Sequence, residues 1–532
     1  MKDKNIFIDF TKKGFNYYNN DIFNDVVESY LAINPEIDLK KLITTTNLTK
    51  VFLEVLAGNL AHVKNRNLMY HTIEGIYDYW RDYKRYLLAD LSKSYAINEE
   101  NYLKIYEDFN DYVLKSYRAI CANLLNKKFT IIRELPAGGN AFILLNKPKK
   151  YPYPILEGIR YIHNVAFRPP FVVYSKSNKR KGIFPIINEN PIDTFTKEGN
   201  WYAYPILVGN SRVIVYFREE YFSLAMALSN LFAHNDDYQD EKPDMIVLFG
   251  SNTCDGVYYD ADKDIYVASL LHRDEIDYFG YMKKIILTVH NIKMIKEKAL
   301  PIHGAGVSLV LKNHQRKNII LIGDSGAGKS ETLEALRKIS DDYIIDMQTV
   351  FDDMGTLVLS HNTLKAYGTE IGAFVRTDDL ENGYAYRVFD RAIFMNPNQS
   401  NARLVLPVAI HDDIVRGVRP DIILYANNYA DSSTKIKLFS NKEEALEVFT
   451  KGRRMAKGTT SENGLVETFF ANPFGPVQLK NETTILLDEY FDYFFKNNIM
   501  VGEIYTGLGL PNGSMNPVKA AIELLAKLKG EN

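Results

Sequence analysis

The chain has 532 residues, of which 46% are apolar, and this length suffices for two or three domains with large cores. Its 64 Lys and Arg residues balance 66 Asp and Glu residues, so no global basic excess points to a nucleic-acid partner. The two cysteines, Cys121 and Cys254, lie far apart and show no metal-binding spacing, which argues against a disulfide framework and favours a reducing cytoplasm.

The N-terminal sequence is charged and lacks the apolar segment of a signal peptide. No run of about 18 apolar residues occurs, and such a run is what a membrane-spanning helix requires. We therefore expect a cytoplasmic protein without a membrane partner.

Residues 1–130 are predicted to be mostly helical, because apolar residues recur there at steps of three and four. From about residue 130, short apolar runs separated by Gly, Pro and Asn predict strands of a mixed sheet. Residues 223–235 predict a helix and residues 242–252 a buried strand. The expected fold class is α/β, with a soft domain boundary near residue 240 that separates residues 1–240 from residues 241–532.

The most informative segment is NIILIGDSGAGKSETLEALRKI, residues 318–339. Residues 319–322 predict a buried strand, and the segment from Glu331 to Ile339 predicts a helix with an apolar face. The loop between them fits the pattern G-x4-G-K-[ST]. The nucleotide-binding residues that it predicts are Gly323, Asp324, Ser325, Gly326, Ala327, Gly328, Lys329, Ser330 and Glu331.

This pattern has a direct chemical purpose. Glycines let successive backbone N–H groups face phosphate oxygens, and the helix N-terminus adds partial positive charge. Lys329 is predicted to bind the β- and γ-phosphates, and the Ser330 hydroxyl is predicted to bind Mg2+. The alternative is a chance match in a glycine turn, which the flanking strand and helix disfavour. The segment therefore predicts ATP or ADP binding and magnesium-dependent phosphoryl transfer.

A carboxylate at the end of a neighbouring strand should complete the metal site. Asp346 follows the apolar residues 343–345, where a buried carboxylate would be costly without a cation, so we expect it to be a metal ligand. Asp352 and Asp353 precede Gly355, and we expect them to lie in a solvated hairpin turn, with a metal role as the alternative.

A series of motifs extends from about Leu231 to about Leu479, and their order resembles that of the ATP-dependent phosphoenolpyruvate carboxykinases. The motifs are SNLFAHN followed by KPDMIVLF, YFGYMKK, PIHGAGV, FDDMGTLVL, SNARLVLP and EALEVFTKGRRMAKGTTSENG. Lys284 and His303 are 19 residues apart, as in that family. The loop sequence GDSGAGKSETLEAL, including Glu331, is closer to that of the HPr kinases, which belong to the same superfamily.

The resemblance implies an N-terminal substrate-side domain, a C-terminal nucleotide domain and a cleft between them. The implied reaction converts oxaloacetate and ATP to phosphoenolpyruvate, CO2 and ADP, in a protein that is commonly a monomer. Tyr278 would contact the substrate carboxylate, and Arg403 would bind a carboxylate or the transferring phosphate. Lys284, in its neutral form, and His303 would bind Mn2+. Lys329 and Ser330 would bind the nucleotide and Mg2+, with Asp346 nearby. The alternatives are that Lys284 is a surface lysine and His303 an ordinary core histidine.

Several positions depart from the carboxykinase pattern. Met347 stands where the second of two paired acids is expected, and His234 stands where the family has an arginine. The late motif GTTSENG lacks the nucleotide-contacting arginine, for which Arg453 or Arg454 is a candidate replacement. The N-terminal substrate arginine has no clear counterpart, and the candidates are Arg133 and Arg168.

These departures leave two alternatives to a carboxykinase. One is a kinase of the same superfamily that phosphorylates another small molecule or a protein. The other is a nucleotide-binding protein that has lost catalytic turnover.

Overall fold

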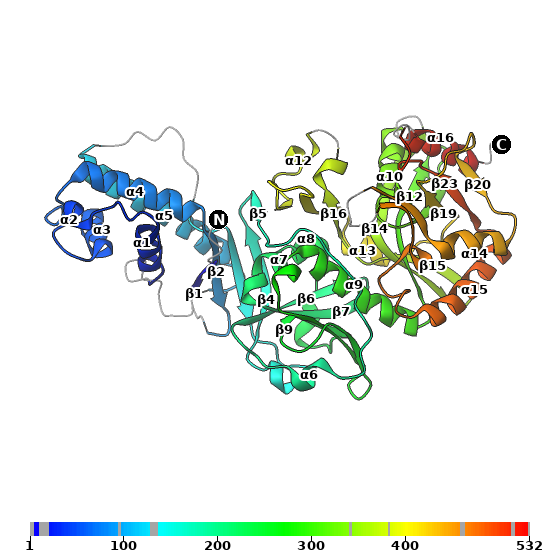
Figure 1. Cartoon of the computed structure of the whole chain (residues 1–532), viewed down its shortest axis with the longest axis horizontal. Helices are drawn as coiled ribbons and strands as arrows, with labels where there is room; N and C mark the ends of the chain where they lie inside the picture. Colours follow the sequence, from blue (N-terminus) through cyan, green and yellow to red (C-terminus); the bar gives the residue numbers. More distant parts are fainter. Residues whose placement is uncertain are drawn as a thin grey trace. The chain divides into compact units, whose positions relative to one another are not determined.

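The computed structural model describes residues 5–9, 21–93, 97–127, 137–339, 343–380, 383–457, 463–511 and 516–529. It has the expected mixed α/β architecture, with helices packed on mixed sheets (Figure 1). The chain forms two compact units: the first comprises Met1–Pro148 and Arg160–Phe171, and the second comprises Lys149–Ile159 and Val172–Asn532. No helix among these described ranges is long and apolar enough to cross a membrane.

Helices make up most of the described part of residues 1–130, as predicted, and the first unit also contains a small sheet. Its strands are β1 (Asn5–Asp9), β2 (Lys84–Asp90), β3 (Ala141–Asn146) and β4 (Arg160–Phe167). Strand β2 pairs in parallel with β1 and β3, and β4 pairs antiparallel with β3. Its longer helices are α1 (Asp21–Ile33), α3 (Leu48–Leu56), α4 (Arg66–Arg81) and α5 (Tyr102–Leu125).

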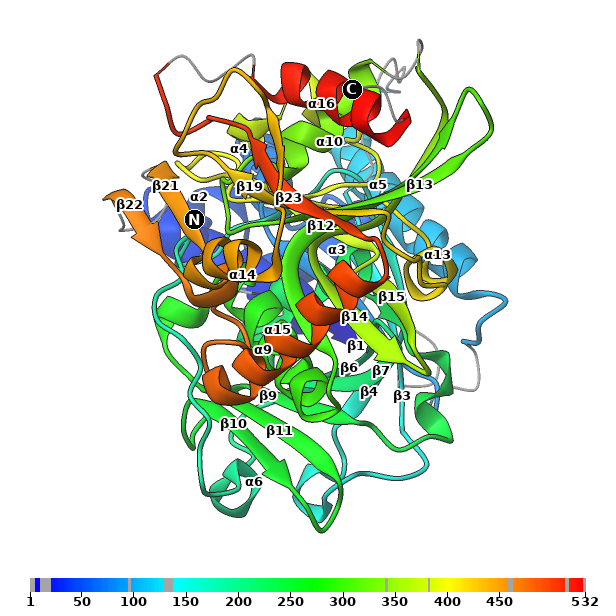
Figure 2. The same ribbon diagram turned by 90° about the vertical axis from the view of Figure 1, so that its right-hand side faces the viewer.

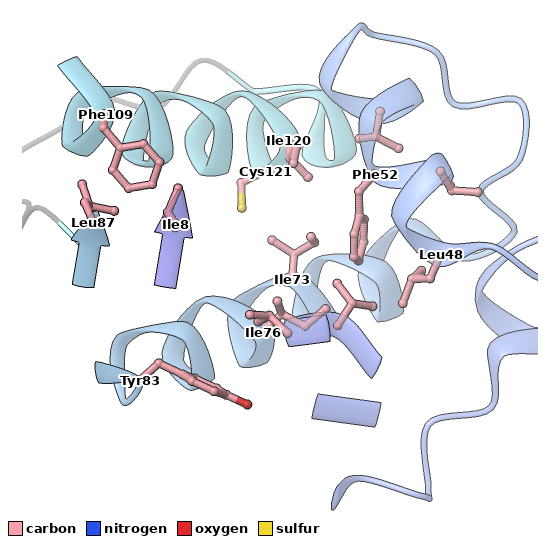
Figure 3. Packing of buried hydrophobic residues seen from close by; sticks show 14 of the residues in the cluster. Ile8, Leu48, Phe52, Ile73, Ile76, Tyr83, Leu87, Phe109, Ile120 and Cys121 are labelled. Atoms are coloured by element: carbon pink, nitrogen blue, oxygen red, sulfur yellow. The ribbon is translucent and has the colours of Figure 1, made fainter. Parts of the chain in front are cut away.

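The helices of this unit bury one face each, as the apolar periodicity predicted. Helix α4 buries Met69, Ile73 and Ile76, which recur at steps of three and four residues. In Figure 3, Ile73 and Ile76 lie on the side of α4 that faces Phe52 from α3 and Ile120 from α5. Within this apolar cluster lies a cavity of about 150 Å³.

The first sheet of the second unit has the strand order β6-β7-β9-β11-β10. The strands are β6 (Trp201–Val208), β7 (Ser211–Arg218), β9 (Met245–Ser251), β11 (Ile265–Leu271) and β10 (Gly256–Asp260). Because β7 and β9 are paired in parallel, the boundary expected near residue 240 falls within one sheet. Short helices α7 (Phe222–Met226) and α8 (Leu228–Leu231) precede β9, and the largely buried helix α9 (Phe279–Lys296) follows β11.

The second sheet has seven strands in the order β15-β14-β12-β13-β19-β23-β20. Their bounds are β15 (Thr363–Gly368), β14 (Ile344–Ser360), β12 (Leu300–Leu311), β13 (Arg316–Ile322), β19 (Ile422–Asn427), β23 (Met500–Tyr505) and β20 (Ile436–Leu438). Alternate residues of β12, such as Ala305 and Val307, pack in one core with helices α10 (Lys329–Lys338) and α16 (Asn516–Lys529). Helix α15 (Lys480–Lys496) lies on the opposite side of this sheet (Figure 2).

Two smaller elements complete the second unit. Strand β18 (Arg403–Pro407) lies between β16 (Gly372–Arg376) and β17 (Ile393–Met395), antiparallel to both. Helix α14 (Lys442–Lys451) leads into a hairpin of β21 (Arg453–Lys457) and β22 (Asn463–Glu467).

Candidate functional site

Strand β12 brings the candidate residues together, because it is the neighbour of both β13 and β14. His303 on β12 is opposite Met354 on β14, and the next residue, Gly304, is opposite Asp353. On the other side of β12, the N–H of Gly323 donates to the carbonyl of His303 at 2.9 Å. The sheet register therefore places His303 between the start of the glycine-rich loop (residues 323–330) and the acidic residues of β14.

Asp353 is the partly buried centre of a charge cluster. Its Oδ1 lies 2.9 Å from Nε2 of His303, and its Oδ2 lies 2.7 Å from Nζ of Lys284. The neighbouring lysine on α9, Lys283, places its Nζ 2.6 Å from the same Oδ2 and 2.8 Å from Oε1 of Glu370. We call Lys283, Lys284, His303, Asp353 and Glu370 the Asp353 cluster.

Asp352 and Asp353 are adjacent in sequence but contact different groups. Oδ1 of Asp352 accepts a hydrogen bond from Oγ of Ser330 at 3.1 Å, at the start of α10. Asp353 has a φ of 99°, a backbone region that Asp enters more readily than most residues. The expected solvated turn at these acids is wrong, because Asp352, Asp353 and Gly355 all lie inside β14, which continues to Ser360.

Asp346 does not join this cluster, which corrects the expectation that it supplies the metal-binding carboxylate. Its side chain is exposed near the start of β14, where its register partner is Val310. Asp353 lies seven residue steps further along the extended strand, a distance of roughly 20 Å at about 3.3 Å per residue. The adjacent acids that contact Ser330 on one side and Lys284 and His303 on the other are those at 352–353.

The two lysines of the cluster differ in charge state. Burial lowers the pKa of Lys284 to about 8, against the opposing attraction of Asp353. Burial also lowers the pKa of Lys283, but the carboxylates of Asp353 and Glu370 outweigh this effect and raise it above its ordinary value. Lys284 is thus the lysine that can act as a neutral nitrogen donor.

The acids of the cluster also differ. Burial acts to raise the pKa of Asp353, but Lys283, Lys284 and His303 hold it well below its usual range. Burial raises the pKa of Glu370 to about 7, because Lys283 offsets only part of the cost. Asp353 is therefore an anion, whereas Glu370 can carry a proton near neutral pH.

The glycine-rich loop has the strand–loop–helix setting that its sequence predicted. It links β13 to α10, and Gly328 has a φ of 100°. A Cβ at Gly328 would lie 2.6 Å from Cβ of Thr506, so glycine is needed both for conformation and for space. Nζ of Lys329 donates to the carbonyl oxygens of Gly323 at 2.7 Å and Asp324 at 3.0 Å. The loop thus folds around the amine of its own lysine.

One of the two candidate replacement arginines reaches this loop. Nε of Arg454, on β21, lies 2.7 Å from Oδ2 of Asp324, and both residues are buried. Arg453 instead pairs with Glu467 across the hairpin at 2.6 Å. Most of the GTTSENG motif that follows β21 lies outside the described residues.

Two phenylalanine rings connect the cluster to other cationic side chains. The Phe374 ring centroid lies 5.0 Å from the guanidinium of Arg403, 5.9 Å from Nζ of Lys283 and 6.0 Å from the Tyr278 ring. The expected substrate residues Tyr278 and Arg403 are therefore gathered beside the cluster. Cation–π contacts of this kind hold a positive group in place without neutralising it.

The second ring, Phe474, lies on the other lysine. Its centroid is 4.6 Å from Nζ of Lys284 and 4.8 Å from the guanidinium of Arg180. Arg180 had no motif to single it out, so sequence reasoning missed it.

The other positions considered in place of the family's arginines lie elsewhere. His234 pairs with Asp236, Arg168 lies over Tyr106 within the first unit, and Arg133 is outside the described residues.

The donor atoms form two sets suited to cations. Lys284, His303 and Asp353 offer two nitrogens and one carboxylate, while Ser330 and Asp352 offer oxygen donors of the kind that Mg2+ prefers. No group of three or more His, Cys, Asp or Glu side chains in the described part of the chain is arranged for a metal ion. The nitrogen-rich set therefore fits a transition metal only with a neutral Lys284 as its third donor.

Two members of the Asp353 cluster were not predicted from the sequence. Lys283 lies in the motif YFGYMKK but was not singled out there, and Glu370 lies in no recognised motif. The acids at 352–353 had a usable signal, since FDDMGTLVL was among the motifs matched to the carboxykinase pattern.

No protein-family model matches the sequence, and no curated protein matches it.

Proposed function

We propose that the chain is an enzyme of nucleotide-dependent phosphoryl transfer. The observation that carries this proposal is the division between two adjacent acids: Asp352 contacts Ser330 of the glycine-rich loop, while Asp353 contacts Lys284 and His303. Two cation sites separated by one peptide unit suit a reaction in which a phosphoryl group passes from a nucleotide to a neighbouring acceptor.

More specifically, we propose ATP-dependent phosphoenolpyruvate carboxykinase-like activity, with oxaloacetate and ATP giving phosphoenolpyruvate, CO2 and ADP. The support is the sequence resemblance together with the grouping of Tyr278, Arg403 and Lys284 around two aromatic rings. An arginine fork and a lysine amine bind and orient a small dicarboxylate, and they stabilise the enolate that forms when CO2 leaves.

The chain's own groups divide the remaining work. Lys329 exchanges the carbonyls of Gly323 and Asp324 for β- and γ-phosphate oxygens. Ser330 and Asp352 would hold Mg2+, and Lys284, His303 and Asp353 would hold Mn2+. Bound divalent cations neutralise charge on the phosphates and the enolate. Lys283 stays protonated and adds a fixed positive charge beside the acceptor.

A second candidate is a kinase of the same superfamily that acts on another acceptor. The feature that favours it is the loop sequence GDSGAGKSE, which resembles the HPr kinases more than the carboxykinases. Both candidates require the same nucleotide and magnesium residues, so they differ only in the acceptor.

The deciding experiment is a coupled assay with phosphoenolpyruvate, bicarbonate, ADP, Mg2+ and Mn2+, in which malate dehydrogenase and NADH report oxaloacetate. We expect turnover that is lost in Lys329→Ala and Lys284→Met but kept in Lys338→Ala, an exposed position on α10. No oxaloacetate from a protein that binds ADP would reject the carboxykinase and retain the kinase. Absence of ADP binding would reject both.

A further inference from the structure

Asp324 is an anion inside the loop that the proposed function assigns to phosphate. Only 6% of the residue is exposed, and its Oδ1 accepts the backbone N–H of Ser325 at 2.7 Å. Its Oδ2 accepts from Nε of Arg454 at 2.7 Å and from Oγ1 of Thr468 at 3.3 Å. A carboxylate with this many donors is held in one position, so its charge acts on fixed neighbours.

One of those neighbours is His303 of the Asp353 cluster. Oδ1 of Asp324 lies 3.4 Å from Nδ1 of His303, and the carbonyl oxygen of Ala471 lies 3.0 Å from the same nitrogen. A cation bound between Nε2 and Asp353 requires the imidazole proton to be on Nδ1, where these two acceptors receive it. Acceptors in this outer position fix the ring of a metal-binding histidine and increase its basicity.

The other neighbour is the phosphate itself. A negative charge in a phosphate-binding loop repels the ligand, and the adjacent guanidinium of Arg454 reduces this repulsion by pairing with it. The same carboxylate therefore acts in opposite directions on the two halves of the site. It assists the donor nitrogen of His303 and opposes phosphate in the loop.

We propose that Asp324 is a positioning residue that strengthens divalent-metal binding at His303 while it weakens nucleotide binding in the glycine-rich loop. The inference rests on the proposed function, and it adds a link between the metal site at His303 and the glycine-rich loop that the reaction itself does not require. It predicts that one variant of Asp324 changes the affinity for metal and the affinity for nucleotide in opposite directions. General damage to the fold would instead weaken both kinds of binding.

Two binding measurements on the full-length protein separate these effects. Electron paramagnetic resonance of free Mn2+ gives the metal affinity without nucleotide, and calorimetry with ADP in EDTA gives the nucleotide affinity without metal. For Asp324→Asn, which preserves shape and removes charge, we expect Mn2+ affinity to fall about 10- to 100-fold, as for other outer-shell changes. We expect its ADP affinity to rise several-fold.

Three further variants calibrate the result. His303→Gln should lose Mn2+ binding and keep ADP binding, whereas Arg454→Met should lose ADP affinity and keep Mn2+ binding, because it leaves the Asp324 charge uncompensated. Asp346→Asn, an exposed position, should change neither. The Arg454→Met variant tests the charge argument even where Asp324→Asn folds poorly.

A fall in both affinities for Asp324→Asn, or unchanged Mn2+ affinity, would overturn the inference and leave the proposed function standing. Wild-type protein that binds neither ADP nor Mn2+ would overturn the proposed function and this inference together.

Discussion

Nζ of Lys283 lies 2.8 Å from Oε1 of Glu370, and both side chains are almost completely withdrawn from solvent. Lys283 therefore has two carboxylate partners, Glu370 and Asp353, whereas its neighbour Lys284 shares only Asp353. This unequal sharing keeps Lys283 charged and makes Lys284 the easier of the two to deprotonate. Glu370 thus helps to keep Lys283 protonated, while burial makes Lys284 the easier of the two to deprotonate.

Glu370 should give the protein a pH-dependent stability. Burial raises its pKa from 4.5 to about 7 in the folded state, so its stabilising contribution is full below pH 4.5 and declines as pH rises to 7. The loss amounts to about 3 kcal/mol at most, at about 1.4 kcal/mol per pKa unit. We expect Glu370→Gln to remove this decline. In urea unfolding at pH 5, 6, 7 and 8, the free energy of unfolding of the variant should rise relative to that of wild type as the pH increases. The same pH dependence in both proteins would contradict the assignment.

Mn2+ binding should depend on the protonation of Lys284. Burial lowers its pKa to about 8, and the metal competes with the remaining proton. We expect Mn2+ affinity to rise about tenfold per pH unit between pH 6 and 8 and to level off above pH 8. Lys284→Met should bind Mn2+ weakly and with a flatter profile. An equally steep profile in Lys284→Met would show that another group controls the competition.

Asp353 and Asp346 provide a matched test of the corrected metal ligand. Both are aspartates of β14, but only Asp353 contacts His303 and Lys284. Asp353→Asn should lower Mn2+ affinity at least 100-fold, since it removes the anionic donor, and Asp346→Asn should leave it unchanged. The reverse order of effects in Mn2+ titrations would contradict the assignment of Asp353 as a metal ligand.

Lys329 should contribute to ADP binding far more than other lysines of α10. Its amine is buried in the glycine-rich loop, whereas the Lys338 side chain is 53% exposed. We expect Lys329→Ala to lower ADP affinity by at least tenfold, about 1.4 kcal/mol or more, and Lys338→Ala to change it less than twofold. Calorimetry of the two variants tests this, and equal affinities would remove the loop from nucleotide binding.

Much of the local structure near the site follows from short-range sequence signals. An apolar run before a glycine-rich loop and a helical periodicity after it predicted β13 and α10 correctly. The resemblance to the carboxykinases implied that Lys284 and His303 share a site, and Asp353 lies within contact distance of both. The position of the acid was missed for a physical reason: β14 continues through its Asp pair and Gly355, residues that usually end a strand.

Other features could not be read from the sequence, because they depend on contacts between distant segments. Glu370 follows β15 and Lys283 lies on α9, so nothing local indicates that they pair. Phe374 and Phe474 are two of 29 phenylalanines, and only the packed structure shows that cations lie over their rings. The boundary near residue 240 was misplaced because charged loops also occur between neighbouring strands of one sheet.

Lys329 holds two carbonyl oxygens of its own loop, and this has a consequence for ligand design. The amine of Lys329 already donates to these two carbonyl oxygens, so an incoming phosphate must replace them before it can bind the amine. The affinity of any phosphate compound will then reflect the difference between the contacts of the amine with phosphate oxygens and its contacts with the loop carbonyls. Under the proposed function, a neutral compound that leaves the amine in place and fills the adjacent surface would avoid that exchange altogether.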